Sequence, residues 1–112
     1  MTTHVLVLRS GPGRPGIEQA LGFAQTWLAQ NEPVAVALIQ DGVLAALDVG
    51  VLPAQQQLRA AVRDGARSLN LAEDLSRRGF GPDDTLAGCE PTGFDGLVDQ
   101  LLADDTRVTG AF

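Results

Sequence analysis

The sequence has 112 residues, of which 45% are apolar and 20% are charged, a composition typical of a folded domain. We therefore predict a single domain over residues 1–112. The net charge of −6 argues against direct binding to a nucleic-acid backbone, because clustered cations bind phosphates. All eight cations are arginine, which excludes a Schiff-base lysine and the lysine of a P-loop.

Single residues limit the possible chemistry further. Cys89 is the only cysteine and His4 the only histidine, so one chain cannot form a disulfide or a multi-histidine metal site. We expect no metal and no cofactor, and His4 to have a structural role at the start of a strand. No segment has the pattern of a signal peptide or the roughly 20 apolar residues of a membrane span. We expect a cytoplasmic protein without a membrane partner.

The first half of the chain alternates between strand and helix. His4–Arg9 has the β-branched and leucine content of a strand, and the glycine- and proline-rich segment Ser10–Gly16 predicts a loop. Apolar residues at helical spacing predict a helix over Ile17–Gln30. Val34–Ile39 then predicts a second strand. Because the connection contains one helix, we expect the two strands to be parallel.

The segment Val34–Val51 is the predicted centre of the fold. Its strand has no polar face, as expected for a parallel sheet covered on both sides. We expect Asp41 to cap a short helix over Val43–Leu47, and Gly42 to allow a sharp turn. This turn follows the carboxyl end of a central strand, where open α/β sheets bind their ligands.

The second half continues the alternation. The patterns predict helices over Ala54–Val62, over Ala72–Arg78 and from Thr92 onward. They predict strands over Arg67–Leu71 and Thr85–Cys89, and a final edge strand over Thr106–Val108. We expect Asn70 with Glu73 to form a capping box, and the apolar stripe of the last helix to be core: Phe94, Leu97, Val98, Leu101 and Leu102. The order predicts an α/β fold with three layers, α/β/α, around a mostly parallel, Rossmann-like sheet of about five strands.

Two sites are candidates for function. The amides of Ser10 and Gly11, assisted by Arg14 and the Asp41–Gly42 turn, could bind an anion where a helix begins. The segment lacks both the dinucleotide and the P-loop glycine patterns, so a plain loop between strand and helix is the favoured alternative. Isolated carboxylates such as Asp74 and Asp83 are better explained as caps or solvated turns than as acid–base groups.

Cys89 is the second candidate. We predict it near the carboxyl end of the fourth strand, just before the last helix, whose amino end would lower its pKa and favour a reactive thiolate. The neighbouring Glu90 would oppose this by raising the pKa of the thiol. A buried, unreactive thiol is therefore the alternative.

Three segments occur together in an order that resembles a known family. They are LIQDGVLAAL (Leu38–Leu47), SLNLAEDLSRRGF (Ser68–Phe80) and FDGLVDQLLADDTRVTGAF (Phe94–Phe112). Together they resemble the DsrE/DsrF/DsrH-like sulfur-relay family, most closely its DsrH/TusB branch. The resemblance extends over essentially the whole chain, and its motifs are specific as an ordered set.

The resemblance implies a DsrE-like α/β subunit of an intracellular sulfur relay. Such subunits assemble as homo-oligomers or with related DsrE/DsrF-like subunits, and a TusA-like sulfur carrier is a further implied partner. The active subunit carries persulfide sulfur on a cysteine, for sulfur oxidation or for 2-thiolation of the tRNA wobble uridine.

One departure from the family pattern matters for function. Sulfur-carrying relatives have a cysteine just after the third strand, where this chain has Asn70–Asp74 and no thiol. The favoured hypothesis is therefore an assembly or docking subunit that is not catalytic alone. The alternatives are a sulfurtransferase that carries persulfide on Cys89, and a module that binds a small ligand or anion through the Ser10–Gly16 loop.

Overall fold

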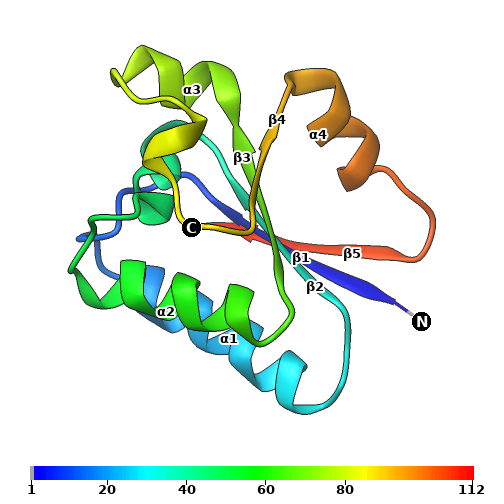
Figure 1. The fold of residues 1–112 in the computed structure, drawn as a ribbon. Helices are drawn as coiled ribbons and strands as arrows, with labels where there is room; N and C mark the ends of the chain where they lie inside the picture. The colour runs from blue at the N-terminus through cyan, green and yellow to red at the C-terminus, as the bar shows by residue number, and fades with distance from the viewer. Residues whose placement is uncertain (1) are drawn as a thin grey trace.

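The computed structural model describes residues 2–112, and its centre is a parallel β-sheet (Figure 1). Neighbouring strands lie in the order β4-β3-β2-β1-β5, and every neighbouring pair is parallel. The strands are β1 (Thr3–Leu8), β2 (Val34–Leu38), β3 (Arg67–Leu71), β4 (Cys89–Thr92) and β5 (Thr106–Ala111). The expected parallel pairing of the first two strands is confirmed.

Helices cover the two faces of the sheet unequally. The α-helices are α1 (Ile17–Ala29), α2 (Pro53–Arg63), α3 (Ala72–Arg77) and α4 (Phe94–Leu101), and the 3-10 helices are η1 (Gln40–Ala46) and η2 (Pro82–Asp84). Buried residues of α1, α2 and η1 form one large cluster with one face of the strands. On the opposite face, α4 contributes Leu97 to a smaller cluster (Figure 1).

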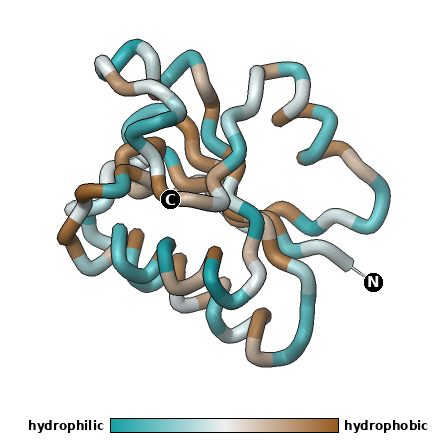
Figure 2. The backbone as a smooth tube through the Cα atoms, in the orientation of Figure 1, coloured by the Kyte–Doolittle hydropathy of each residue, from teal (hydrophilic) through white to brown (hydrophobic). Residues whose placement is uncertain are grey.

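The apolar pattern of the strands explains their central position. All five residues of β2 are buried, as a strand covered on both faces requires. The most hydrophobic stretches of the chain follow the central strands (Figure 2). Within residues 2–112, no helix has the length and hydropathy needed to cross a bilayer.

Most predicted elements are confirmed to within one or two residues, and so is the predicted α/β class with a five-stranded parallel sheet. The fourth strand is the main error, because it begins at Cys89 where we expected it to end. The Leu86 amide instead donates to the Ala46 carbonyl, and Gly88 has a φ of 94° that turns the chain. Pro91 is tolerated in β4 because this strand lies at the sheet edge.

Two predicted helix caps are wrong. Asp41 lies inside η1, which Ile39 precedes without any side-chain cap, and the Asp41 carboxylate accepts from Arg78 Nε at 2.9 Å. Asn70 lies within β3, where its side chain accepts from Ser68 Oγ at 3.2 Å. The Asp41 side chain is thus held by Arg78 of a distant segment, and the Asn70 side chain by Ser68 of its own strand.

The apolar stripe of α4 is core only in part. Leu97 is buried, whereas Phe94 is 59% exposed and Leu102 is 78% exposed. The expectation that the whole stripe is buried is therefore wrong. The helix is only eight residues long and covers only part of its sheet face.

Candidate functional site at the carboxyl edge of the sheet

The carboxyl ends of β1 and β2 bring together four of the five residues predicted for binding. The β1 strand leads into the loop of Ser10 and Gly11, and β2 leads into the turn of Asp41 and Gly42. A Cβ on Gly11 would lie 3.8 Å from the Asp41 Cβ, and one on Gly42 would overlap the Leu8 carbonyl oxygen. Glycine at position 42 is therefore required by the close approach of the backbone to β1.

The remaining predicted residue, Arg14, belongs to the same loop but has an exposed side chain. Its backbone amide donates to the Gly11 carbonyl at 3.0 Å, which closes a turn. The amides of Arg9 and Ser10 both donate to the Phe112 carbonyl oxygen, at 2.7 and 2.9 Å. These two donors are therefore engaged within the protein, and anion binding by this loop stays a prediction.

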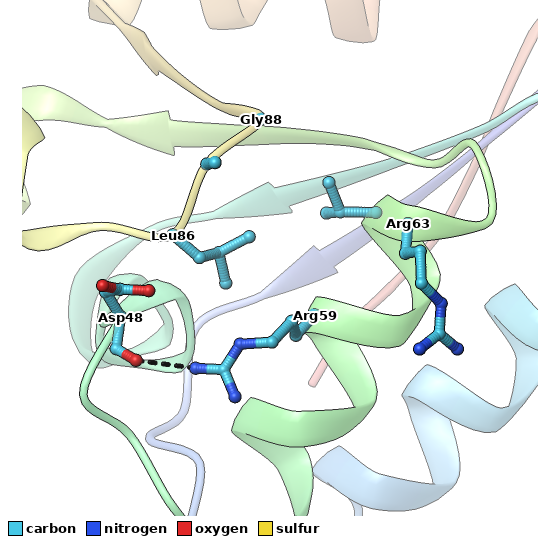
Figure 3. A pocket seen from close by; sticks show the side chains of 7 residues that line it. Asp48, Arg59, Arg63, Leu86 and Gly88 are labelled. Carbon is cyan, nitrogen blue, oxygen red and sulfur yellow. Dashed lines mark hydrogen bonds between the residues drawn. The ribbon is translucent and has the colours of Figure 1, made fainter.

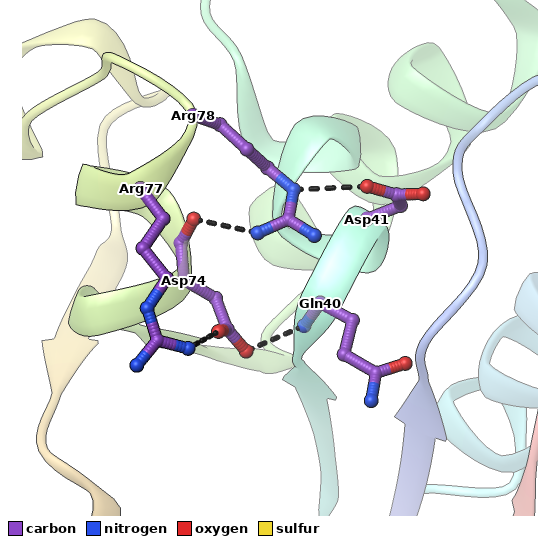
Figure 4. A network of polar contacts seen from close by, with 5 residues as sticks. All are labelled: Gln40, Asp41, Asp74, Arg77 and Arg78. Atoms are coloured by element: carbon purple, nitrogen blue, oxygen red, sulfur yellow. Dashed lines mark hydrogen bonds and ion pairs between the residues drawn. The ribbon is translucent and has the colours of Figure 1, made fainter.

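A polar network fixes the turn after β2 against α3 (Figure 4). Asp74 is 7% exposed, and its carboxylate accepts from the backbone amide of Gln40 at 2.7 Å and from Arg77 Nη1 at 3.4 Å. Arg78 donates to Asp41 and also to the Asp74 carbonyl oxygen at 2.9 Å. Gln40 has a φ of 50°, a left-handed conformation that is unfavourable outside glycine. The Asp74 carboxylate holds it in place.

Asp74 is the residue at this edge whose role the sequence analysis missed. Its partner Gln40 is 34 positions away in the chain, so local spacing contains no sign of the contact. The segment Asn70–Asp74 has no thiol, and here its acidic residue serves to position the backbone of another loop. The chemistry available at this edge is hydrogen bonding and charge, without a nucleophile.

The structure places Cys89 elsewhere than predicted. It is the first residue of β4 and pairs in register with Ser68, so it lies at the amino end of that strand and away from the start of α4. The expected activation of the thiol by a helix amino end is therefore wrong. Burial raises the pKa of the Cys89 thiol, hydrogen bonds with Ser68 and Asn70 lower it in part, and the Glu90 charge raises it again.

A surface hollow lies between α2 and the segment that precedes Cys89 (Figure 3). Its volume is about 570 Å³, and its charged lining residues are Asp48, Arg59 and Arg63. Apolar groups complete the lining, from Val62, Leu86, Ala87 and Gly88. Arg59 Nη2 donates to the Asp48 carbonyl oxygen at 2.7 Å. Local sequence patterns do not predict this hollow, because its walls come from segments far apart in the chain.

Comparison with known proteins decides the family. The family model described as "DsrH like protein" matches residues 18–107. The chain belongs to the DsrH-like family. This confirms the resemblance found in the sequence, and family membership supports a role as a subunit of a sulfur-relay system.

Solved structures support the same fold. The crystal structure of the ychN protein from E.coli superposes with a TM-score of 0.86 at 22% sequence identity, covering 100% of both chains. A protein of unknown function from Methanobacterium thermoautotrophicum superposes with a TM-score of 0.77 at 13% identity, covering 97% of this chain and 98% of the other. No curated protein matches this DsrH-like chain in sequence.

Proposed function

We propose that this DsrH-like chain is an assembly or docking subunit of a cytoplasmic sulfur-relay system and is not a catalyst by itself. The observation that carries the proposal is family membership together with the missing thiol in Asn70–Asp74. Without a nucleophile at that position, the carboxyl edge cannot hold sulfur covalently. Its contribution is then a fixed surface for other subunits of the relay.

The carboxyl edge suits a docking role because it is held rigidly. The Asp74 carboxylate fixes the Gln40 backbone, and Arg78 links Asp41 to α3. Beside it, the loop from Val49 to Leu52 exposes apolar side chains that the chain itself does not cover. A preformed surface loses little conformational entropy when a partner binds to it.

The sheet face under α4 is a second surface in need of a partner. Phe94 and Leu102 are largely exposed, and Val108 on the edge strand β5 is 45% exposed. Apolar side chains gathered on one face are typical of a subunit interface. We assign this face to a related DsrE/DsrF-like subunit or to a second copy of the chain.

The proposed relay role also implies which proteins the assembly would exchange sulfur with. A TusA-like sulfur carrier would deliver sulfur to the active partner subunit, and the sulfur would leave for sulfur oxidation or for thiolation of the tRNA wobble uridine. The net charge of −6 favours contact with proteins over direct contact with the tRNA backbone.

Charge substitutions on the α4 face test the proposal. We expect Leu102→Glu and Phe94→Glu to abolish the complex, or to weaken it by about a hundredfold, because each places a charge in an apolar interface. Both residues are exposed, so the circular dichroism spectrum should not change. The complex is measured by native mass spectrometry of the chain alone and mixed with related subunits.

Val49→Glu is the matched control, because Val49 is also exposed but lies in the loop before α2. It should leave the α4-face complex intact while testing docking at the carboxyl edge. A chain that stays monomeric at high concentration and binds no related subunit would contradict the proposed function.

A further inference from the structure

Cys89 lies in a buried polar cluster with Ser68 and Asn70. The Cys89 thiol donates to Ser68 Oγ at 3.3 Å, and the Ser68 hydroxyl donates to Asn70 Oδ1 at 3.2 Å. Ser68 is fully buried and Asn70 is 1% exposed. Because residues 68 and 70 point to the same side of β3, both side chains lie on the face where Cys89 packs.

The amide nitrogen of Asn70 is unused in this cluster. Nδ2 is buried and has no hydrogen-bond partner while Cys89 is a neutral thiol. A buried donor without a partner costs roughly 1–3 kcal/mol, so such groups are rare without a functional reason. The Asn70 side chain nevertheless stabilises negative charge on the Cys89 sulfur, since it lowers the pKa of that thiol.

We propose that Cys89 accepts sulfane sulfur, and that Ser68 and Asn70 hold the resulting persulfide as an anion. The proposal rests on the sulfur-relay function, which supplies the class of substrate. Burial keeps the thiol protonated, whereas a persulfide is a stronger acid and ionises more readily. Its terminal sulfur would accept hydrogen bonds from the Ser68 hydroxyl and from the unused Asn70 amide, so the cluster fits the persulfide better than the thiol.

The transfer step balances without an oxidant. Cys89 loses its proton, and its sulfur attacks the outer sulfur of a donor R–S–SH. The S–S bond of the donor breaks, a new S–S bond forms on Cys89, and the departing thiolate takes up a proton. The net reaction converts Cys89–SH and R–S–SH into Cys89–S–SH and R–SH, and the new persulfide then ionises.

The entrance assigned to an anionic donor is the hollow beside α2, whose lining does not include Cys89 itself. Gly88, which directly precedes Cys89, lines the hollow, and Arg59 and Arg63 contribute positive charge to its walls. The main negative charge next to Cys89 is Glu90, which Arg67 binds at 3.0 Å. Asp48 lines the same hollow and Asp64 lies 3.6 Å from Arg63, so a small persulfide that carries carboxylates would bind here through direct contact with the guanidinium groups.

The test is intact mass spectrometry after incubation with glutathione persulfide. Wild-type protein should gain one sulfur atom, and Cys89→Ser should gain none. Asn70→Leu, with the same number of side-chain heavy atoms, and Ser68→Ala should each shorten the lifetime of the persulfide about tenfold, since each removes one hydrogen bond to an anion. Ser76→Ala, an exposed serine in α3, is the control and should load as wild type.

Circular dichroism first establishes that each variant folds. If Asn70→Leu does not fold, Ser68→Ala alone is used for the test. Arg63→Gln should slow loading roughly tenfold if the hollow is the entrance; an unchanged rate would remove the hollow from the proposal. The site itself is overturned by no sulfur gain in wild type, by addition of whole glutathione, or by gain that survives Cys89→Ser.

The same variants separate this inference from the proposed function. Cys89→Ser should still form the complex with related subunits, because Cys89 packs on the sheet face opposite to α4. Failure to load sulfur with an intact complex would overturn the sulfur-accepting site alone. Failure of the wild-type protein to form any complex with itself or with related subunits would overturn the assembly role.

Discussion

The two ends of the sheet differ in how fully their polar groups are used. At the carboxyl edge, the Asp74 carboxylate, the Gln40 amide and the amides of Arg9 and Ser10 all have partners within the protein. In the cluster around Cys89, the first residue of β4, one buried donor of Asn70 has no partner. A network in which every polar group has a partner stabilises one conformation. A buried donor without a partner can still form a hydrogen bond when a neighbouring group becomes an anion.

This difference bears on where sulfur chemistry can occur in the chain. The segment after β3 has no thiol, and its Asp74 carboxylate has a structural role. The one thiol lies at the other end of the sheet, beside donors that suit an anion. The absence of a thiol after β3 is therefore compatible with the sulfur-accepting site proposed at Cys89.

Gly42→Ala should have the largest effect, because it tests how tightly the carboxyl edge is packed. The added Cβ would overlap the backbone of Leu8, so we expect a loss of about 4 kcal/mol in the free energy of unfolding, or failure to fold. Gly22→Ala is the matched control, since nothing lies within 4 Å of its Cβ position in α1. It should stabilise the protein by about 0.5–1 kcal/mol in urea denaturation.

Asp74→Ala tests the polar network at the same edge. The change leaves the Gln40 amide without its acceptor, so we expect a loss of about 1–3 kcal/mol in the free energy of unfolding. Asp74→Asn keeps an acceptor oxygen and should cost less. Asp83→Ala, at an exposed position in η2, should stay within about 0.5 kcal/mol of wild type. Equal effects of the three changes would refute the role given to Asp74.

The amino end is tested by the reactivity of Cys89 toward iodoacetamide. Because burial raises the pKa of the folded thiol, alkylation at pH 7 should be about tenfold slower than in urea. The folded state holds this proton more tightly, so the thiol stabilises the protein below the ordinary cysteine pKa. That contribution is lost as pH rises above it. Equal rates in folded and unfolded protein would contradict the buried cluster.

The smallest effect is expected for the ion pair that neutralises Glu90. Arg67 lowers the pKa of the Glu90 carboxyl, so the pair stabilises the protein above the ordinary glutamate pKa and less as pH falls through the lowered value. Both side chains are about half exposed, so solvent screening limits Glu90→Gln to about 0.5 kcal/mol at neutral pH. The difference between variant and wild type should vanish in acid, as measured by thermal unfolding at several pH values.

The strands and long helices could be predicted from the sequence because local patterns encode them. The fully apolar Val34–Leu38 and the helical spacing after Ile17 each require one kind of element. The fourth strand could not, since Pro91 and Glu90 oppose strand formation locally and pairing with β3 outweighs them. The error moved Cys89 to the wrong end of its strand.

The candidate site was predictable only in part, for a related reason. The meeting of Gly11 with the Asp41 turn follows from parallel topology, which places the carboxyl ends of neighbouring strands together. The contacts of Asp74 with Gln40 and of Ser68 with Cys89 join distant segments of the chain. The position of Asp41 suits a helix cap, but Arg78, 37 positions later, binds its carboxylate.

The most direct test of the assembly role is native mass spectrometry of the chain mixed with related DsrE/DsrF-like subunits, repeated with Cys89→Ser. A defined complex of equal stability with either chain is the predicted result, because assembly does not depend on the thiol. A monomer that binds no related subunit at high concentration would contradict the account, as would a complex that forms only when Cys89 is present.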